Sequence, residues 1–305
     1  MDLTLFSDPV FLLQNLVDGL SRGDLYAVYA MGLSLIFGVL DIINLAHAAT
    51  FMWCAITGWV VMAVFGLPLA GGLLIAMLAG ACLCLLLEYV AFRPLRREGA
   101  DRLSAMISSI GMSLILVSIA EAVFGVETRR FPNSVLSPKP FHLGGVRVSP
   151  AQILIMVASV VLMGAMGYFI RRTPMGKAIR AIAADQKAAR LLGIHVEAVI
   201  ATTFITAGAL AGAAGILVGL LTNNIVPDMG GQIQLRGLAV VILGGMGNME
   251  GAVLGGLILG VIETFTIAYL PGGSDVKDAV VFLILFLILF VRPNGIMGRR
   301  SGERA

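Results

Sequence analysis

Residues that could carry out enzymatic chemistry are scarce and scattered in this sequence. The three histidines are too far apart to give a metal-ligand spacing, and the phosphate-binding pattern GxxxxGK(S/T) is absent. Cys54, Cys82 and Cys84 all lie in apolar runs, which indicates neither a disulfide framework nor a zinc site. We therefore expect no catalytic residues, no bound metal and no cofactor on this chain.

A first group of polar residues within an apolar stretch lies in LDIINLAHAAT, which starts at Leu40. Asn44 and His47 are three positions apart, so on a helix they share one face. Polar side chains are costly in lipid and usually face a bundle interior or a water path. Two interpretations stay open: a turn and helix whose Asn44 and His47 bond to nearby backbone, or, together with Thr50, the wall of a translocation path.

A second group, LGGMGNMEG, places Gly244, Gly245 and Gly247 immediately before Asn248. These residues interrupt an otherwise apolar stretch. Irregular backbone at membrane depth is tolerated where it lines a cavity or is buried in protein. The segment is therefore either a tight turn between two spans or a part of the same translocation path.

The composition defines the class of fold that must position these residues. The chain is 58% hydrophobic and 13% charged, whereas about a quarter of the residues of soluble domains are charged. Several apolar runs approach 20 residues, the length that crosses a bilayer as a helix, and they are continuous rather than alternating as in a barrel. We predict an all-α polytopic membrane protein, a single transmembrane domain over residues 1–305.

The apolar runs predict about eight to ten transmembrane helices. A count of ten alternates consistently across the membrane and places the N-terminus inside. The candidate spans are about 6–20, 24–41, 44–65, 68–92, 104–125, 150–170, 198–220, 235–247, 248–270 and 278–291.

Lysine and arginine in the connections indicate the orientation of the chain. Cations cluster after Arg93, in the 171–197 loop and at the C-terminus, which we place on the cytoplasmic side. The loop at about 126–149 is rich in Pro and Gly, and alternation puts it outside as an extended external loop.

The 171–197 segment is the longest polar, helix-competent run in the sequence. It carries six cations against two acids, and no Gly or Pro falls between Lys177 and Leu192. Thr173 suits an N-cap, Pro174 the first helical position and Gly193 the stop. We predict one helix of about four turns on the water side. It would either rest on lipid head groups or dock into a groove of a soluble partner.

Glycines recur at four-residue spacing in the later part of the chain, as in Gly208 and Gly212 or Gly256 and Gly260. Small residues at this spacing let helix backbones approach closely in lipid, where packing drives association. The later helices are therefore expected to form a tightly packed bundle.

Four segments together resemble a known family. They are GLSLIFGVLDIINLAHAAT, TPMGKAIRAIAADQKAARLLGI, LRGLAVVILGGMGNMEGAVLGGLILGVIE and LFVRPNGIMGR. In this order they resemble the LivH-type permease of branched-chain amino acid ABC importers, from about Asp24 to Arg299. The resemblance implies a multi-pass protein of the bacterial inner membrane without ATPase activity of its own. Its partners would be a second related permease, two cytoplasmic ATPase subunits that bind the ATP, and an external solute-binding protein.

The resemblance also implies that the 171–197 loop is a coupling loop that docks into the ATPase. Its match to the broader EAA-x3-G signature of importers is loose, because Asp185 follows the two alanines and no Glu precedes them. Carried over residue by residue, the coupling positions are Gly176, Arg180, Ala183, Ala184, Asp185, Ala188, Leu192 and Gly193.

The chain departs from the family pattern after His47. The family usually reads INFAHG, whereas here Ala48 replaces the glycine, and Trp53 and Cys54 add bulk. Urea, amides or aromatic acids are therefore alternative solutes within the same machinery. A stand-alone secondary transporter is the alternative from another class, and it would require charged pairs inside the spans for ion coupling.

Overall fold

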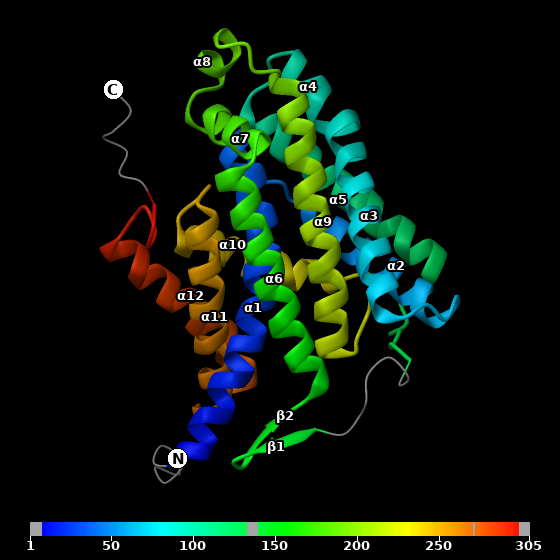
Figure 1. Ribbon diagram of the computed structural model, residues 1–305, viewed down its shortest axis with the longest axis vertical. Helices are drawn as coiled ribbons and strands as arrows, with labels where there is room; N and C mark the ends of the chain where they lie inside the picture. Colours follow the sequence, from blue (N-terminus) through cyan, green and yellow to red (C-terminus); the bar gives the residue numbers. More distant parts are fainter. Residues whose placement is uncertain (1–7, 133–139, 271, 299–305) are drawn as a thin grey trace.

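The computed structural model describes residues 8–132, 140–270 and 272–298 as a bundle of helices with one small β-hairpin (Figure 1). Ser149, Asp101, Asn248 and Asp8 cap the helices that follow them through side-chain hydrogen bonds. The elements are α1 (Pro9–Leu40), α2 (His47–Ala63), α3 (Leu69–Leu87), the π-helix η2 (Glu88–Phe92), α4 (Arg93–Arg97), α5 (Arg102–Phe124), β1 (Phe141–Leu143), β2 (Val146–Val148), α6 (Pro150–Arg172), α7 (Pro174–Ala184), α8 (Gln186–Leu191), α9 (Val196–Thr222), α10 (Met229–Gly244), α11 (Met249–Tyr269) and α12 (Gly273–Val291).

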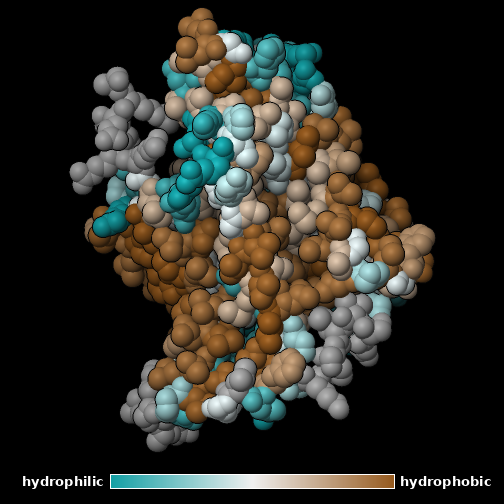
Figure 2. Space-filling model, viewed as in Figure 1, coloured by the Kyte–Doolittle hydropathy of each residue, from teal (hydrophilic) through white to brown (hydrophobic). Residues whose placement is uncertain are grey.

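The all-α polytopic architecture is confirmed. Within the described residues, 6 helical segments are long and apolar enough to cross a membrane, and α2 and α10 are shorter apolar helices of 17 and 16 residues. The apolar α12 adds 19 residues. A hydrophobic band covers the middle of the molecule, and hydrophilic surface gathers over α7 and near α4 at its upper end (Figure 2).

The expected division into ten spans is wrong at the N-terminal end. The runs 6–20 and 24–41 do not form two helices, because α1 continues through the polar SRGD sequence between them as one helix of 32 residues. Ser21 and Asp24 are buried inside the bundle, so no loop is needed to bring them to water.

The sequence placed the N-terminus on the same side as the 171–197 loop, and this expectation is wrong. The start of α1 lies at the opposite end of the bundle. The Gln14 side chain donates to the carbonyl oxygen of Arg147 at 3.0 Å and accepts from its N–H at 2.8 Å. These bonds fix the start of α1 to the β1–β2 hairpin at the lower end, whereas α7 and α8 lie at the upper end (Figure 1). The hairpin turns at Gly144 and Gly145, which both have positive φ. Residues 133–139 of the predicted external loop lie outside the described residues.

Close backbone contact joins α1 to α11, as the glycine spacing predicts. A Cβ added at Gly23 would lie 2.8 Å from the Cα of Leu257, and one at Gly256 would lie 2.6 Å from the backbone nitrogen of Ala27. No real Cβ comes so near, so only glycine permits this approach. Helices α3 and α9 approach each other in the same way, with backbone contact at Gly80 and Gly208.

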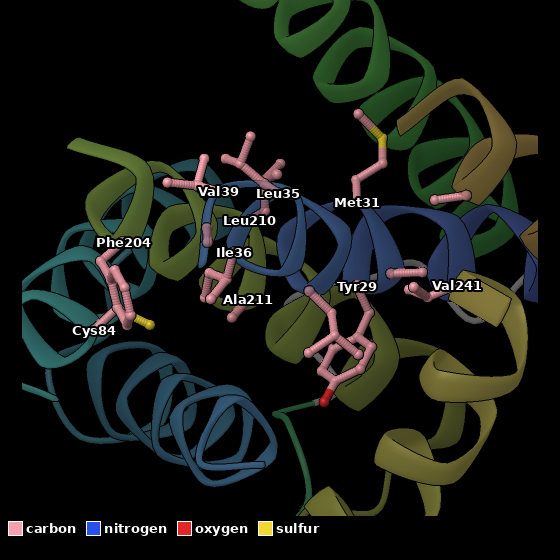
Figure 3. Close-up of a cluster of buried hydrophobic side chains, with 14 of the residues drawn as sticks. Tyr29, Met31, Leu35, Ile36, Val39, Cys84, Phe204, Leu210, Ala211 and Val241 are labelled. Atoms are coloured by element: carbon pink, nitrogen blue, oxygen red, sulfur yellow. The ribbon is translucent and has the colours of Figure 1, made fainter. Parts of the chain in front are cut away.

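The hydrophobic core surrounds α1 and α9. Side chains from α1, α9, α10 and α3 meet in it, and Tyr29 projects from the same stretch of α1 (Figure 3). By contrast, α5 and α6 expose rows of Ile, Leu and Val on their outer faces. The central helices are thus positioned by protein contacts, and the outer ones face lipid or another membrane protein.

We expect Gly23→Ala to destabilise the bundle, because the added methyl group meets the α11 backbone rather than a flexible side chain. Overpacking of about 2 kcal/mol corresponds to a fall in Tm of roughly 4–8 °C, measured by thermal unfolding in detergent. Gly164→Ala on α6 is the matched control, because open space surrounds that glycine. Equal Tm values for the two variants would show that the α1–α11 approach is not tight.

Candidate functional site

The first predicted polar group lies at the start of α2, inside the bundle. Asn44 turns the chain by accepting a hydrogen bond from the Ala46 N–H at 3.0 Å, and Thr50 donates to the Ala46 carbonyl oxygen at 3.2 Å. Asn44, His47 and Thr50 are fully buried. In this conformation none of the three faces an open path. The local backbone bond of Asn44 agrees with the structural interpretation, which also expected His47 to bond to nearby backbone.

His47 belongs to a buried polar cluster that the sequence did not indicate. Its ring lies 5.0 Å from the ring of Tyr29 on α1, and the Tyr29 hydroxyl donates to the Gln234 side-chain oxygen on α10 at 2.5 Å. Neither ring nitrogen of His47 forms a hydrogen bond of good geometry with the described residues. The cluster joins three helices, and each of its members is separated from the others in sequence, which is why no local motif revealed it.

The second predicted group forms a tight turn between α10 and α11. Gly245 and Gly247 have φ values of 108° and 77°, a left-handed conformation that favours glycine. Asn248 accepts from the N–H groups of Glu250 and Gly251 and so caps α11. Gly244 lies directly against the backbone of Gly251. These contacts agree with the turn interpretation.

The segment that follows α12 holds this turn in place through hydrogen bonds. Ile296 and Met297 donate backbone hydrogen bonds to the carbonyl oxygens of Leu243 and Gly244 at 2.8 and 3.0 Å. The Asn248 amide completes the contact by donating to the Met297 carbonyl oxygen at 2.8 Å. The turn lies at the arm end of the bundle, so the structure does not bring it together with the His47 cluster.

The 171–197 segment folds as an arm, which we define as residues 173–195. Thr173 caps α7 by accepting from the Gly176 N–H at 3.0 Å, Pro174 begins the helix, and Gly193 has a φ of 82° after α8. These start and stop signals are confirmed. The predicted single helix of four turns is wrong, because the chain becomes extended at Asp185 and divides into α7 and α8.

Asp185 causes this division through its side chain. The carboxylate accepts from the backbone N–H groups of Lys187 and Ala188 at 2.7 and 3.0 Å, so it caps α8 instead of continuing α7. The N–H groups of Ala188 and Lys187 hold the pKa of the Asp185 carboxyl below its usual value. The cap is therefore present at neutral pH.

The arm has one face against the bundle and one face open. Ile179, Ile182 and Ala189 are buried, and α7 contacts α6, α1 and α9. Leu191 and Leu192 at the tip are 89% and 82% exposed. Among the predicted coupling positions, Gly176 is buried against α6, and the rest are exposed: Arg180, Ala183, Ala184, Asp185, Ala188, Leu192 and Gly193.

An ion-pair network beside the arm joins the end of α3 to the start of α9. Arg96 donates to Glu88 at 2.7 Å and to Glu197 at 2.6 Å, and Arg93 lies 3.3 Å from the same Glu197 oxygen. Glu88 is almost completely buried, so Arg96 compensates a charge that would otherwise be costly. In the sequence these cations indicate only the orientation of the chain.

A second charged cluster lies between α1, α10, α11 and α12. Glu263 is fully buried, accepts from the Tyr26 hydroxyl at 2.6 Å and lies 3.4 Å from Arg236. Arg22 and Lys277 each approach it to 3.8 Å. The acidic partners of Arg236 come from other helices, Glu263 from α11 and Asp278 from α12.

The structure so far defines a polytopic helical membrane protein with tightly packed central helices and a polar arm at one end. The family model described as branched-chain amino acid transport system / permease component matches residues 15–289. This chain belongs to that family, and it is a multi-pass permease subunit of the inner membrane.

The sequence is similar to curated permeases along most of their length. The chain is 36% identical to the high-affinity branched-chain amino acid transport system permease protein BraD of Pseudomonas aeruginosa, over 96% of this chain and 97% of that one. It is 34% identical to LivH of Escherichia coli strain K12, over 97% and 98%. The ribose import permease protein RbsC of the same strain is 26% identical, over 94% and 88%.

We expect Asp185→Ala to unfold α8 locally, because the helix loses the acceptor for two of its first N–H groups. Hydrogen exchange of the 187–190 amides should become faster, while the amides of α7 keep their wild-type rates. Asp185→Asn is the control, since asparagine is an equally good N-cap. Unchanged exchange in the alanine variant would mean that α8 does not depend on this cap.

Proposed function

We propose that this chain forms the membrane path of an ATP-driven importer for branched-chain amino acids. Membership of the permease family and the names of the relatives BraD and LivH support this solute class. The chain would act with a second related permease, two ATPase subunits that carry ATP, and a solute-binding protein at the hairpin end.

One observation carries the coupling role of the arm: its apolar tip projects into water instead of packing on the bundle. Leu191 and Leu192 are the most exposed leucines among the described residues. An exposed apolar pair beside cations is typical of a surface that enters a groove of a partner protein. We infer that this partner is an ATPase subunit, which makes the arm end cytoplasmic.

The base of the arm offers a direct route from the ATPase to the centre of the bundle. Ile179 and Ile182 pack into the core cluster that also contains Tyr29, and α7 contacts both α1 and α9. A push on the arm would therefore displace α1, which carries Tyr29 against His47. ATP supplies the bias between inward-open and outward-open states that solute binding alone cannot provide.

The buried polar residues at the start of α2 are the candidate wall of the translocation path in this proposal. Asn44, His47 and Thr50 would face the solute only after α1 and α2 separate during the cycle. The solute contact predicted for Gly244, Gly245, Gly247 and Asn248 stays a prediction, since their present contacts are those of a turn.

The bulk added at Trp53 does not argue against a branched-chain solute. Its indole N–H donates to the Leu116 carbonyl oxygen on α5 at 2.9 Å, and its ring packs against Phe124 of the same helix. Branched-chain amino acids are better supported than urea, amides or aromatic acids, because BraD and LivH are named as branched-chain amino acid permeases.

The chain is expressed together with its neighbouring genes and purified in detergent. The double variant Leu191→Ser and Leu192→Ser should no longer co-purify with the ATPase subunits. ATP-dependent uptake of leucine by the reconstituted complex should fall by at least ten-fold, because the tip loses its apolar contact. Phenylalanine, urea and a short amide serve as competing solutes in the same assay.

The matched control is Phe65→Ser with Leu67→Ser, which removes exposed apolar area in the α2–α3 connection. This control should keep both the ATPase and the uptake. Retention of the ATPase by the tip variant would contradict the coupling role. Uptake competed more strongly by urea or phenylalanine than by leucine would leave the coupling role intact and change the solute.

A single cysteine at Thr50 tests the path. In a background with Cys54, Cys82 and Cys84 replaced by alanine, we expect Thr50→Cys to react with a water-soluble thiol reagent only during ATP turnover, because the residue is fully buried at rest. Thr222→Cys, at an exposed position, should react under both conditions. Absence of any reaction at position 50 during active uptake would place the path elsewhere.

A further inference from the structure

A basic cavity of about 760 Å³ opens at the arm end, between the end of the α3–α4 segment and the start of α9. Arg93 and Arg97 line it from α4, and Arg190 and His195 line it from the arm. The ring of Tyr89 forms part of the wall, with the Arg93 guanidinium 4.7 Å from its centroid. Hydrophilic surface also gathers near α4 at the upper end of the molecule (Figure 2).

The cavity carries more positive charge than its own residues neutralise. Among the described residues that line it, the single acid is Glu197, and its carboxylate is already shared by Arg96 and Arg93. The charge of Arg97 also acts on Glu197, but neither Arg97 nor Arg190 forms a salt bridge within the described part of the chain. Two exposed arginines therefore line the cavity without a salt-bridge partner, and an anion bound there would form charge-assisted hydrogen bonds with them.

The depth of the cavity points to the kind of anion. It lies where one apolar segment, Leu69–Arg97, ends and another, Val196–Thr222, begins, which is the level of lipid head groups. Below the arginines its wall is formed by Ala198 and Ala201. Exposed apolar side chains continue this surface one turn further into the membrane, at Leu86 on α3 and Ile205 on α9.

From these contacts we propose that the cavity binds the phosphate of an anionic membrane lipid. Arg97 and Arg190 hold the phosphate, and the acyl chains lie along the exposed apolar side chains of Leu86 and Ile205. A bound lipid would link α4 to the arm through its head group, because the two arginines come from these two elements. The proposal requires only membrane insertion and does not depend on the coupling role of the arm.

The test uses the full purified chain and native mass spectrometry with added phosphatidylglycerol or phosphatidylcholine. Wild-type protein should retain more phosphatidylglycerol than phosphatidylcholine. Arg97→Gln combined with Arg190→Gln should weaken phosphatidylglycerol binding about 25-fold, since each basic residue near a membrane surface contributes roughly five-fold. The control is Arg172→Gln with Lys177→Gln, which removes the same charge from exposed positions at the same end, and it should change binding less than two-fold.

A second variant separates a lipid from a soluble phosphate. Ala201→Phe fills the apolar wall without altering charge, so it should weaken phosphatidylglycerol binding several-fold while the thermal stability of the chain is kept. Equal retention of the two lipids by the wild type would overturn the site. An equal loss of phosphatidylglycerol binding in the Arg97/Arg190 variant and in the Arg172/Lys177 control would also overturn it. Displacement of the lipid by equimolar glycerol phosphate, or unchanged binding in Ala201→Phe, would overturn the lipid assignment.

Discussion

Contact between glycine backbones on α1 and α11 is the constraint on which the rest of this structure depends. Lipid gives two apolar helices no hydrophobic reason to associate, so close packing must supply the stabilisation. Gly23 and Gly256 allow that packing, and α1 consequently remains helical through its polar SRGD sequence. The position of α1 in turn fixes Tyr29, the start of α2 and the base of the arm.

Polar groups in the apolar bundle are held by partners from distant parts of the chain. Glu88 depends on Arg96, Glu263 on Tyr26 and Arg236, and Tyr29 on Gln234. A secondary transporter would be expected to show charged pairs inside its spans, and the Glu263 cluster is one. Family membership assigns the chain to the permeases nonetheless, and the cluster is explained there by the need to compensate a buried carboxylate.

The two ends of the molecule differ in a way that fits directional transport. At one end Gln14 joins α1 to the hairpin, and at the other the arm, the α10–α11 turn and the C-terminal segment lie together. The arm end concentrates cations, and α7 and α8 leave their polar faces open. The arm rests directly on the core, because α7 contacts α1 and α9, which are the most deeply buried helices.

The sequence by itself determined the membrane class, the start and stop of the arm and the tight packing of the later helices. Each follows from local composition or spacing: apolar length, the pair Thr173–Pro174 with Gly193, and glycines four apart. Only the tertiary structure decided that the first two apolar runs are one helix, that Asp185 divides the arm, and that His47 meets Tyr29 and Gln234. A buried polar residue takes its partner from whichever helix packs against it, and that choice is made by the fold rather than by neighbours in the chain.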